Sequence, residues 1–576
     1  MAAPIDPNEF ARVADKIGLF AVLRDMASSG SLERGPEFVS TVANLINQGE
    51  VVFYDHPDAT TLNELDGRAF WDLQIFLCEL IPQINVPCAA LMWLIETLVE
   101  KGGDDGMANQ PNTAFRKWCA ADLQRSEEVL AAARKGKRLA ARHLGLALEA
   151  SGDAENALRL LSEEHGSEVH LGAITALGRI DLKEELAATA ANEVAQYAAD
   201  HADENVQNNA LVSTFAILKR HTDLDRASAV AALAQATKCP TANTLHAIAT
   251  VLWLHGGSMT EDEVTVAFET LENVDPGHLG TLSRIDMSLG DLVAAGRFDQ
   301  VSGFVKSYTK HNKTRDALKL FAGLQSELLK NNGYLSRTVV DWFLDGDVSL
   351  CASLASMLMG VPDEPIELSL VTVDLPTDSE EQLVLCRRAV GHLFQSPVTA
   401  ASVIVSVLEQ GDLSCADELK DLLLDPLLYS YGGSLRSYLE AVRERLLDPG
   451  GEVLQTCLET KAEMLENMQG IESGKELHPS ESQRQLERVR WHRHMREAVR
   501  EDMKNSVLLP LATTQTLLYG TKSSSYIADP GGELRKVEMS MGEYSVTQEY
   551  PQLDIFDPEG LQLRLLALKI GRGAAK

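Results

Sequence analysis

Basic side chains recur every fourth residue near the end of the chain, a pattern that could bind phosphate groups. In an α-helix, four residues advance about 40° beyond a full turn, so such a row winds slowly along one side. Arginine presents forked donors that match phosphate oxygens, and Trp491 could stack on a base. The candidate nucleic-acid or anion contacts are Arg484, Arg488, Arg490, His492, Arg493, Arg496, Arg500 and Lys504.

A second interpretation of the same helix is structural, and it is the preferred one. An apolar row with the same spacing borders the basic row along its length: Trp491, Met495, Val499, Met503 and Val507. A helix can pack by such a row while its arginine stems lie over the edge of the contact and pair with carboxylates. Arg493 and Glu497 have the spacing of such an ion pair.

The charge of the whole chain limits the nucleic-acid interpretation. With 84 acidic and 52 basic residues, the net charge is −32, so most of the surface repels phosphate backbones and anionic lipid. Residues 484–504 contain seven Arg or Lys against four acids, a net +3. The whole chain therefore disfavours nucleic-acid binding, but its charge still allows a local basic site at 484–504.

Other clusters of polar residues carry weaker signals. The run 134–138 with Arg142 and His143 could hold an anion at a helix joint, or it could be a solvated turn. His165 and His170 lack a nearby cysteine or a known metal motif. No nucleophile, cofactor or metal motif is recognisable. We therefore expect no catalytic residues, no cofactor and no metal.

The cysteines and the apolar segments indicate a cytoplasmic protein. Eight cysteines are widely spaced without a CxxC pair, a pattern typical of buried free thiols in a reducing compartment. The N-terminus lacks the basic and apolar parts of a signal peptide. Residues 75–99, the most apolar segment, contain acidic residues and prolines and fall short of the ~20 apolar residues that a membrane span requires.

A glycine-led phrase recurs along the chain and predicts the elements around these residues. It begins at Gly152, Gly296 and Gly411, each followed by a run rich in leucine, alanine or valine, with looser copies at Gly178, Gly290 and Gly346. Glycine can close one helix in the left-handed conformation, and a following Asp or Ser can cap the next. The phrase therefore predicts repeated helix–turn–helix joints.

These joints resemble α-solenoids of the HEAT or tetratricopeptide kind. The resemblance rests on phrases such as residues 146–158 and covers about half of the chain. The joints are unequally spaced, without a 34-residue or ~40-residue period. The resemblance implies a curved stack with a partner-binding face, and the alternative is an irregular helical domain.

The predicted fold is mainly α: an irregular α-solenoid or stacked helical hairpins, with a small C-terminal module that contains strands. Residues 366–373 alternate like a lone extended connector, after which Ser379 and Gln382 are placed to form a capping box. The predicted parts are an N-terminal helical domain at 1–110, the stack at 111–447, long charged helices at 448–510 and a β-hairpin module with a terminal helix at 511–576.

The predicted function is that of a non-enzymatic cytosolic scaffold or adaptor that binds protein partners in an assembly, with self-association as a further option. The alternatives are a nucleic-acid-associated subunit that uses residues 484–504, and an enzyme without a recognisable motif. No membrane partner is expected. The module at 511–576 is expected to dock the protein to a partner or to a second copy. The alternative is that its apolar helix at 561–570 folds back onto the helix at 484–507.

Overall fold

The computed structural model is mainly α, and it divides into two compact units. Unit 1 contains Met1–Trp342 and Asp347–Met357, and unit 2 contains Phe343–Gly346 and Leu358–Lys576. The predicted boundaries at 110, 447 and 510 stay predictions. The structure describes residues 7–32, 35–53, 60–103, 109–313, 317–359, 365–469, 480–504, 522–528, 534–540 and 551–571.

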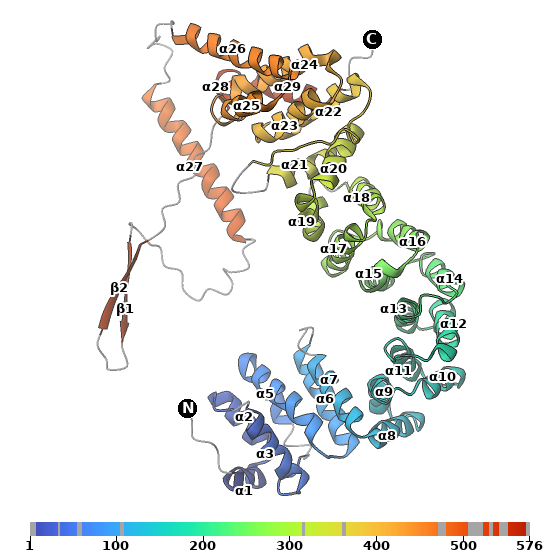
Figure 1. Cartoon of the computed structure of the whole chain (residues 1–576). Coiled ribbons are helices and arrows are strands. Elements are labelled where there is room, and N and C mark those ends of the chain that lie inside the picture. Colours follow the sequence, from blue (N-terminus) through green and yellow to red (C-terminus); the bar gives the residue numbers. More distant parts are fainter. Residues whose placement is uncertain are drawn as a thin grey trace. The chain divides into compact units, whose positions relative to one another are not determined.

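Unit 1 consists of helices joined by short turns (Figure 1). Its N-terminal elements are α1 Pro7–Ile17, α2 Leu19–Ser29, α3 Pro36–Asn47, η1 Thr60–Glu64, α5 Gly67–Leu80, η2 Ile81–Gln83, α6 Cys88–Gly102, α7 Gln110–Ala121, α8 Leu123–Arg134, α9 Arg138–Ser151, α10 Ala154–Ser162 and α11 Ser167–Leu177. Then follow α12 Glu184–Asp200, α13 Glu204–Arg220, α14 Ala227–Ala236, α15 Ala242–His255, η4 Gly256–Ser258, α16 Glu261–Leu271, α17 Leu279–Ala294, α18 Phe298–Asn312, η5 Ala317–Leu320 and α19 Ala322–Lys330. Helices α20 Asn332–Asp345 and α21 Val348–Met359 each continue from unit 1 into unit 2.

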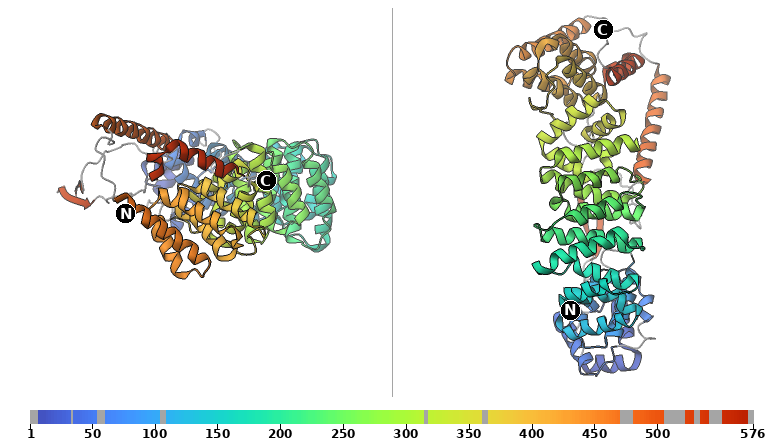
Figure 2. Two further views of the ribbon diagram at one scale, coloured as in Figure 1. Left: turned by 90° about the horizontal axis from the view of Figure 1, so that it is seen from above. Right: turned by 90° about the vertical axis from the view of Figure 1, so that its right-hand side faces the viewer.

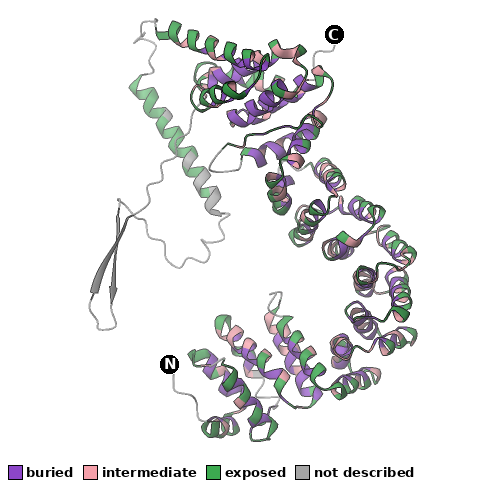
Figure 3. Ribbon diagram, in the orientation of Figure 1, coloured by how far each residue is buried: buried purple, intermediate pink, exposed green. Residues whose placement is uncertain are grey.

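The middle helices of unit 1 lie in two rows. In one row α7 contacts α9, α9 contacts α11, and the series continues through α13, α15 and α17 to α19. In the other row α10, α12, α14, α16 and α18 contact one another in order. Figure 2 shows these helices stacked one upon the next, and Figure 3 shows that buried residues gather where helices meet. Each helical pair therefore packs mainly on its neighbours in sequence.

Hydrogen bonds between successive helical pairs join residues that are about the same number of positions apart in the sequence. Tyr197 Oη donates to the Leu161 carbonyl at 2.6 Å, 36 residues away. Lys219 Nζ donates to the Leu254 carbonyl at 2.8 Å, 35 residues away. Helices α11, α13, α15 and α17 begin at Ser167, Glu204, Ala242 and Leu279, respectively. This spacing of 37 or 38 residues is more regular than the glycine-led joints predicted.

The glycine-led joints form in part as predicted. Gly152 ends α9 with a φ of 67°, and the Asp153 side chain accepts a hydrogen bond from the Asn156 amide at 3.0 Å. Gly296 has a φ of 82°, but α18 begins without a side-chain cap. The joint predicted at Gly290 is wrong, because this glycine lies inside α17, whose turns bury Leu289 and Leu292 on either side.

Two other glycines let helices α9 and α11 approach closely. A Cβ atom added at Gly145 would lie 3.0 Å from the Gly172 carbonyl oxygen. One added at Gly172 would lie 3.1 Å from the Gly145 nitrogen. Glycine at both positions therefore lets the two helices approach closely, because a Cβ atom at either position would be too near the opposite helix.

We predict that Gly145→Val destabilises unit 1 by about 1–3 kcal/mol, because the added methyl groups would force the two helices apart. The matched control is Gly303→Val in α18, where an added Cβ meets nothing within 4 Å; its effect should stay within about 0.5 kcal/mol. Denaturant unfolding followed by circular dichroism measures both. Equal unfolding midpoints for the two variants would refute the close packing of α9 on α11.

Unit 2 contains the remaining elements. They are α22 Ser379–Leu393, α23 Pro397–Gln410, η6 Leu413–Cys415, α24 Ala416–Leu422, η7 Leu423–Leu428, α25 Ser434–Arg445, α26 Gly450–Gln469, α27 Glu481–Lys504, β1 Lys522–Ala528, β2 Leu534–Ser540, α28 Gln552–Phe556 and α29 Pro558–Ile570. Strands β1 and β2 pair antiparallel, with Ser525 opposite Val537. Residues 516–519 and 543–549, whose sequence also favours short strands, lie outside the described residues.

The predicted extended connector at 366–373 pairs with no described strand, and it ends in a turn in which the Asp374 amide donates to the Val371 carbonyl at 2.9 Å. The Leu368 amide donates to Ser402 Oγ on α23 at 2.9 Å. The Leu370 amide donates to Ser406 Oγ at 3.1 Å. Helix hydroxyls thus satisfy backbone groups that a sheet would otherwise pair.

The predicted capping box from Ser379 to Gln382 is wrong. Asp378 is the residue that caps α22, and its carboxylate accepts from the Glu380 amide at 3.3 Å. Gln382 is buried; its Nε2 donates to the Pro376 carbonyl at 2.7 Å and its Oε1 accepts from the Asp412 amide at 2.9 Å. Its side chain therefore joins two loops and does not close the helix end.

The apolar C-terminal helix α29 packs on α22. A Cβ added at Gly391 of α22 would lie 3.0 Å from the Lys569 nitrogen, so the backbones are close. Arg564 Nη1 also donates to Asp425 Oδ1 at 2.6 Å. The alternative that this helix folds back onto residues 484–507 is therefore wrong for the described residues, because α22 supplies the covering surface.

Candidate functional site

Helix α27 carries the predicted basic row, and its described basic side chains are all exposed. Ser480 precedes the helix and accepts a hydrogen bond from the Gln483 amide at 3.3 Å, which satisfies one of the free amides of the first turn. The exposed basic residues are Arg484, Arg488, Arg490, His492, Arg493, Arg496 and Arg500. Lys504 ends the helix, and its side chain lies outside the described residues.

The arginines of α27 have few carboxylate partners within the described part of the chain. Arg484 Nη2 lies 3.1 Å from Glu481 Oε2, an exposed pair one turn apart. The pair predicted between Arg493 and Glu497 does not form among the described ion pairs. The other described guanidinium groups of α27 are exposed to solvent.

The described apolar side chains of α27 are also exposed. Leu486, Val489 and Trp491 retain 54%, 52% and 60% of their accessible surface. The rings of Trp491 and His492 meet edge to face with centroids 5.4 Å apart. The side chains of Met495 and Val499 lie outside the described residues, so packing by the complete apolar row stays a prediction. An exposed indole beside guanidinium groups can stack on a planar ligand.

We predict that replacing Arg488, Arg496 and Arg500 together by alanine leaves the melting temperature nearly unchanged. Exposed side chains without close partners contribute within about 0.5 kcal/mol each. The control is Arg388→Ala: Arg388 is buried, and its Nη1 donates to the Phe343 and Leu344 carbonyls at 2.5 and 2.8 Å. Thermal unfolding measures both variants. A fall for the triple variant as large as that for Arg388→Ala would show that the basic row is structural.

Two arginines of the second basic patch pair with carboxylates. Arg138 Nε lies 3.3 Å from Glu168 Oε1, and Arg142 pairs with both Glu96 and Glu168. His143 is buried beneath them. Burial, together with the positive charge of Arg142, lowers the pKa of His143 to about 4. These two arginines therefore join helices α6, α9 and α11, whereas Lys135 and Lys137 of the same patch are exposed.

The structure brings His165 and His170 into an aromatic cluster with Tyr197 and His201. The ring centroids of His170 lie 5.1 Å from Tyr197 and 5.8 Å from His201. Burial lowers the pKa of His170, and the neighbouring His201 and His165 lower it further. Among the described residues, no three side chains are placed to hold a metal ion. The cluster packs by ring contacts, and sequence reasoning missed Tyr197 and His201 because they come from the next helical pair.

Helix α29 leaves an apolar face uncovered. Leu561 is buried, whereas Leu563, Leu566 and Ile570 retain 68%, 52% and 66% of their accessible surface. These three residues share one side of the helix, since they lie three and four positions apart. Ile555 and Phe556 on the adjoining α28 are also exposed. One side of α29 is therefore covered by α22, and another side is an exposed apolar face.

Comparisons with known proteins identify no relative. No protein-family model, curated protein or solved structure matches the chain. Within the residues that the structure describes, the helices are too short or too polar to cross a bilayer.

Proposed function

We propose that this protein is a non-enzymatic helical scaffold that binds protein partners in a cytosolic assembly. The observation that carries the proposal is the double row of helices in unit 1, in which α7 to α19 contact one another at every second helix and α10 to α18 do the same. Such stacks bury a continuous core between neighbours and present long surfaces to partners. We propose that the rows form an irregular α-solenoid.

The chemistry of the surface supports protein partners over nucleic acid. The net charge of −32 opposes a phosphate backbone along most of the chain. Solvent-exposed apolar side chains on α29, namely Leu563, Leu566 and Ile570, are more suited to contact with protein. We propose that this face belongs to the docking part of the scaffold, with a second copy as one possible partner.

Affinity purification of the tagged full chain from its native host, read by mass spectrometry, tests the proposal. We expect the same one or more proteins to be enriched in repeated preparations at physiological salt. The control bait carries Arg488→Ala, Arg496→Ala and Arg500→Ala, and it should recover the same proteins after nuclease treatment. Recovery of the chain alone, together with turnover of a substrate by the pure chain, would refute the scaffold function.

A second candidate function is favoured by the exposed arginines of α27. If this helix binds nucleic acid, its affinity should fall steeply between 50 and 200 mM salt, by about ten-fold or more for each few phosphate contacts. A gel-shift titration at the two salt concentrations measures this. The triple arginine variant should lose the shift while its melting temperature holds, whereas an unshifted wild-type chain would exclude the function for this helix.

A further inference from the structure

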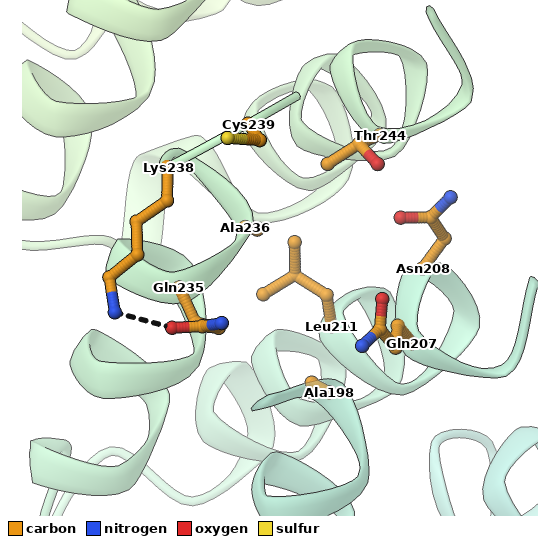
Figure 4. A pocket seen from close by; sticks show the side chains of 9 residues that line it. All are labelled: Ala198, Gln207, Asn208, Leu211, Gln235, Ala236, Lys238, Cys239 and Thr244. Carbon is orange, nitrogen blue, oxygen red and sulfur yellow. Dashed lines mark hydrogen bonds between the residues drawn. The ribbon is translucent and has the colours of Figure 1, made fainter. Parts of the chain in front are cut away.

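A surface pocket lies between consecutive helical pairs of unit 1 (Figure 4). Helices α12 and α13 supply one side, and α14, the following turn and α15 supply the other. Its volume is about 350 Å³, which is within the usual size of ligand pockets. The pocket is lined by Ala198, Gln207, Asn208, Leu211, Gln235, Ala236, Lys238, Cys239 and Thr244.

The lining is dominated by neutral groups that form hydrogen bonds. Gln207 and Asn208 stand side by side on α13, and neither side-chain amide bonds to another described residue. Gln235 faces them from α14, where its Oε1 accepts from Lys238 Nζ at 2.6 Å. Lys238, the one charged side chain of the lining, thus donates to Gln235, and the two amides of α13 have no partner among the described residues.

Hydrogen bonds fix the wall of the pocket that contains Thr244 of α15. Thr244 is buried, and its Oγ1 donates to Glu204 Oε1 at 3.3 Å. The Thr244 amide donates to the capping hydroxyl of Thr241 at 3.2 Å. This wall is thus built by the first turns of α13 and α15.

The floor and the rim differ in character. Leu211 and Ala198 are buried and form an apolar floor, with the Leu211 side chain directed into the middle of the pocket in Figure 4. Cys239 at the rim is exposed, whereas the other seven cysteines are buried or half-buried. A ligand in this pocket would place a small apolar group over Leu211 and would pass close to Cys239.

We propose that this pocket binds the main chain of an extended peptide segment, with a small side chain over Leu211. A primary amide both donates and accepts, so Gln207 and Asn208 can pair with the two polar groups of a peptide unit. The lining lacks an aromatic ring on which a nucleobase could stack. The proposal rests on the proposed scaffold function and names the part of a partner that this surface recognises.

The probe is acetyl-tetraalanine methylamide, compared with the analogue in which the central amide is replaced by an ester. Two readouts on the full chain are the rate of Cys239 alkylation by N-ethylmaleimide and the shift of the Leu211 methyl signals in NMR. Burial raises the pKa of Cys78 to about 12 and that of Cys88 to about 11, so Cys239 should react first.

We expect millimolar peptide to slow Cys239 alkylation several-fold and to shift the Leu211 methyl signals with saturation. The ester should do so at least five-fold more weakly, because it lacks the central donor. Gln207→Ala with Asn208→Ala should abolish both effects. The matched control Asn209→Ala should retain them, because the Asn209 side chain bonds to Asn205 outside the lining.

Equal protection by peptide and ester, no effect of peptide on either readout, or stronger protection by adenosine would each overturn the peptide proposal. The experiments distinguish failure of the pocket proposal from failure of the scaffold function. If host proteins copurify with the chain but peptide leaves the pocket unaffected, the scaffold stands and the pocket proposal is wrong. If peptide binds as expected but the chain purifies alone, the pocket proposal stands and the scaffold function is wrong.

Discussion

Replacing Glu263 by alanine is expected to destabilise unit 1 by about 3–5 kcal/mol, the usual cost of leaving one partner of a buried ion pair alone. Arg226 Nε and Nη2 lie 2.8 and 2.7 Å from the two oxygens of Glu263, whose side chain is 1% exposed. The same carboxylate accepts from the Thr260 amide at 2.8 Å and completes a capping box at the start of α16. One substitution therefore removes two interactions. It removes the ion pair with Arg226, and it removes the hydrogen bond by which Glu263 completes the capping box of α16.

Denaturant unfolding of the wild type, each single variant and the double variant with Arg226→Ala measures the coupling between the two residues. Glu261→Ala is the control, since Glu261 is an exposed acid in the same first turn, and it should cost less than about 1 kcal/mol. A loss for Glu263→Ala no larger than that of the control would contradict the buried pair.

Acidification is expected to destabilise the protein through buried neutral histidines. Burial lowers the pKa of His143 and of His255 in unit 1, and of His392 in unit 2, to about 4 in each case. An unfolded histidine titrates near pH 6.5, so the unfolded chain binds more protons below that pH. The stability is therefore present above pH 6.5 and is lost progressively as the pH falls towards 4. For His143 alone, the loss at pH 5.5 is roughly 1 kcal/mol.

The acid effect is measured as a difference between variants, because lowering the pH also reduces the net charge of −32 and with it the repulsion within the chain. Unfolding free energies of wild type and His143→Gln are compared at pH 7.5 and 5.5. The variant should lose roughly 1 kcal/mol less than the wild type over this interval. An identical pH dependence for both chains would contradict the neutral state of His143.

The fold could be predicted from sequence where the signal is local. The joint at Gly152 and Asp153 needs only a left-handed glycine and an adjacent capping carboxylate, so three residues carry the information. Gly290 has the same residue type but lies inside α17, because burial of its neighbours outweighs the local cost of glycine. The packing of α29 on α22 depends on Gly391, about 170 positions earlier in the chain, and no local pattern indicates it.

The candidate sites also differ in whether a local sequence pattern predicts them. The four-residue spacing from Arg484 to Arg500 predicts a basic row, and the structure adds that its described side chains are exposed. The amide pocket could not be predicted, because Gln207, Gln235 and Thr244 come from three helices and form no sequence motif. A pocket of neutral side chains depends on how successive helical pairs meet, which propensity and charge pattern do not specify.

The most direct test of the scaffold function is the mass and composition of the particle that contains this chain in its native host. The tagged protein is isolated at physiological salt, treated with nuclease and measured by light scattering, with its components quantified by mass spectrometry. The scaffold function predicts a mass above the 62.8 kDa of the single chain and at least one other polypeptide in a fixed molar ratio. A particle of 62.8 kDa that contains only this chain would contradict it.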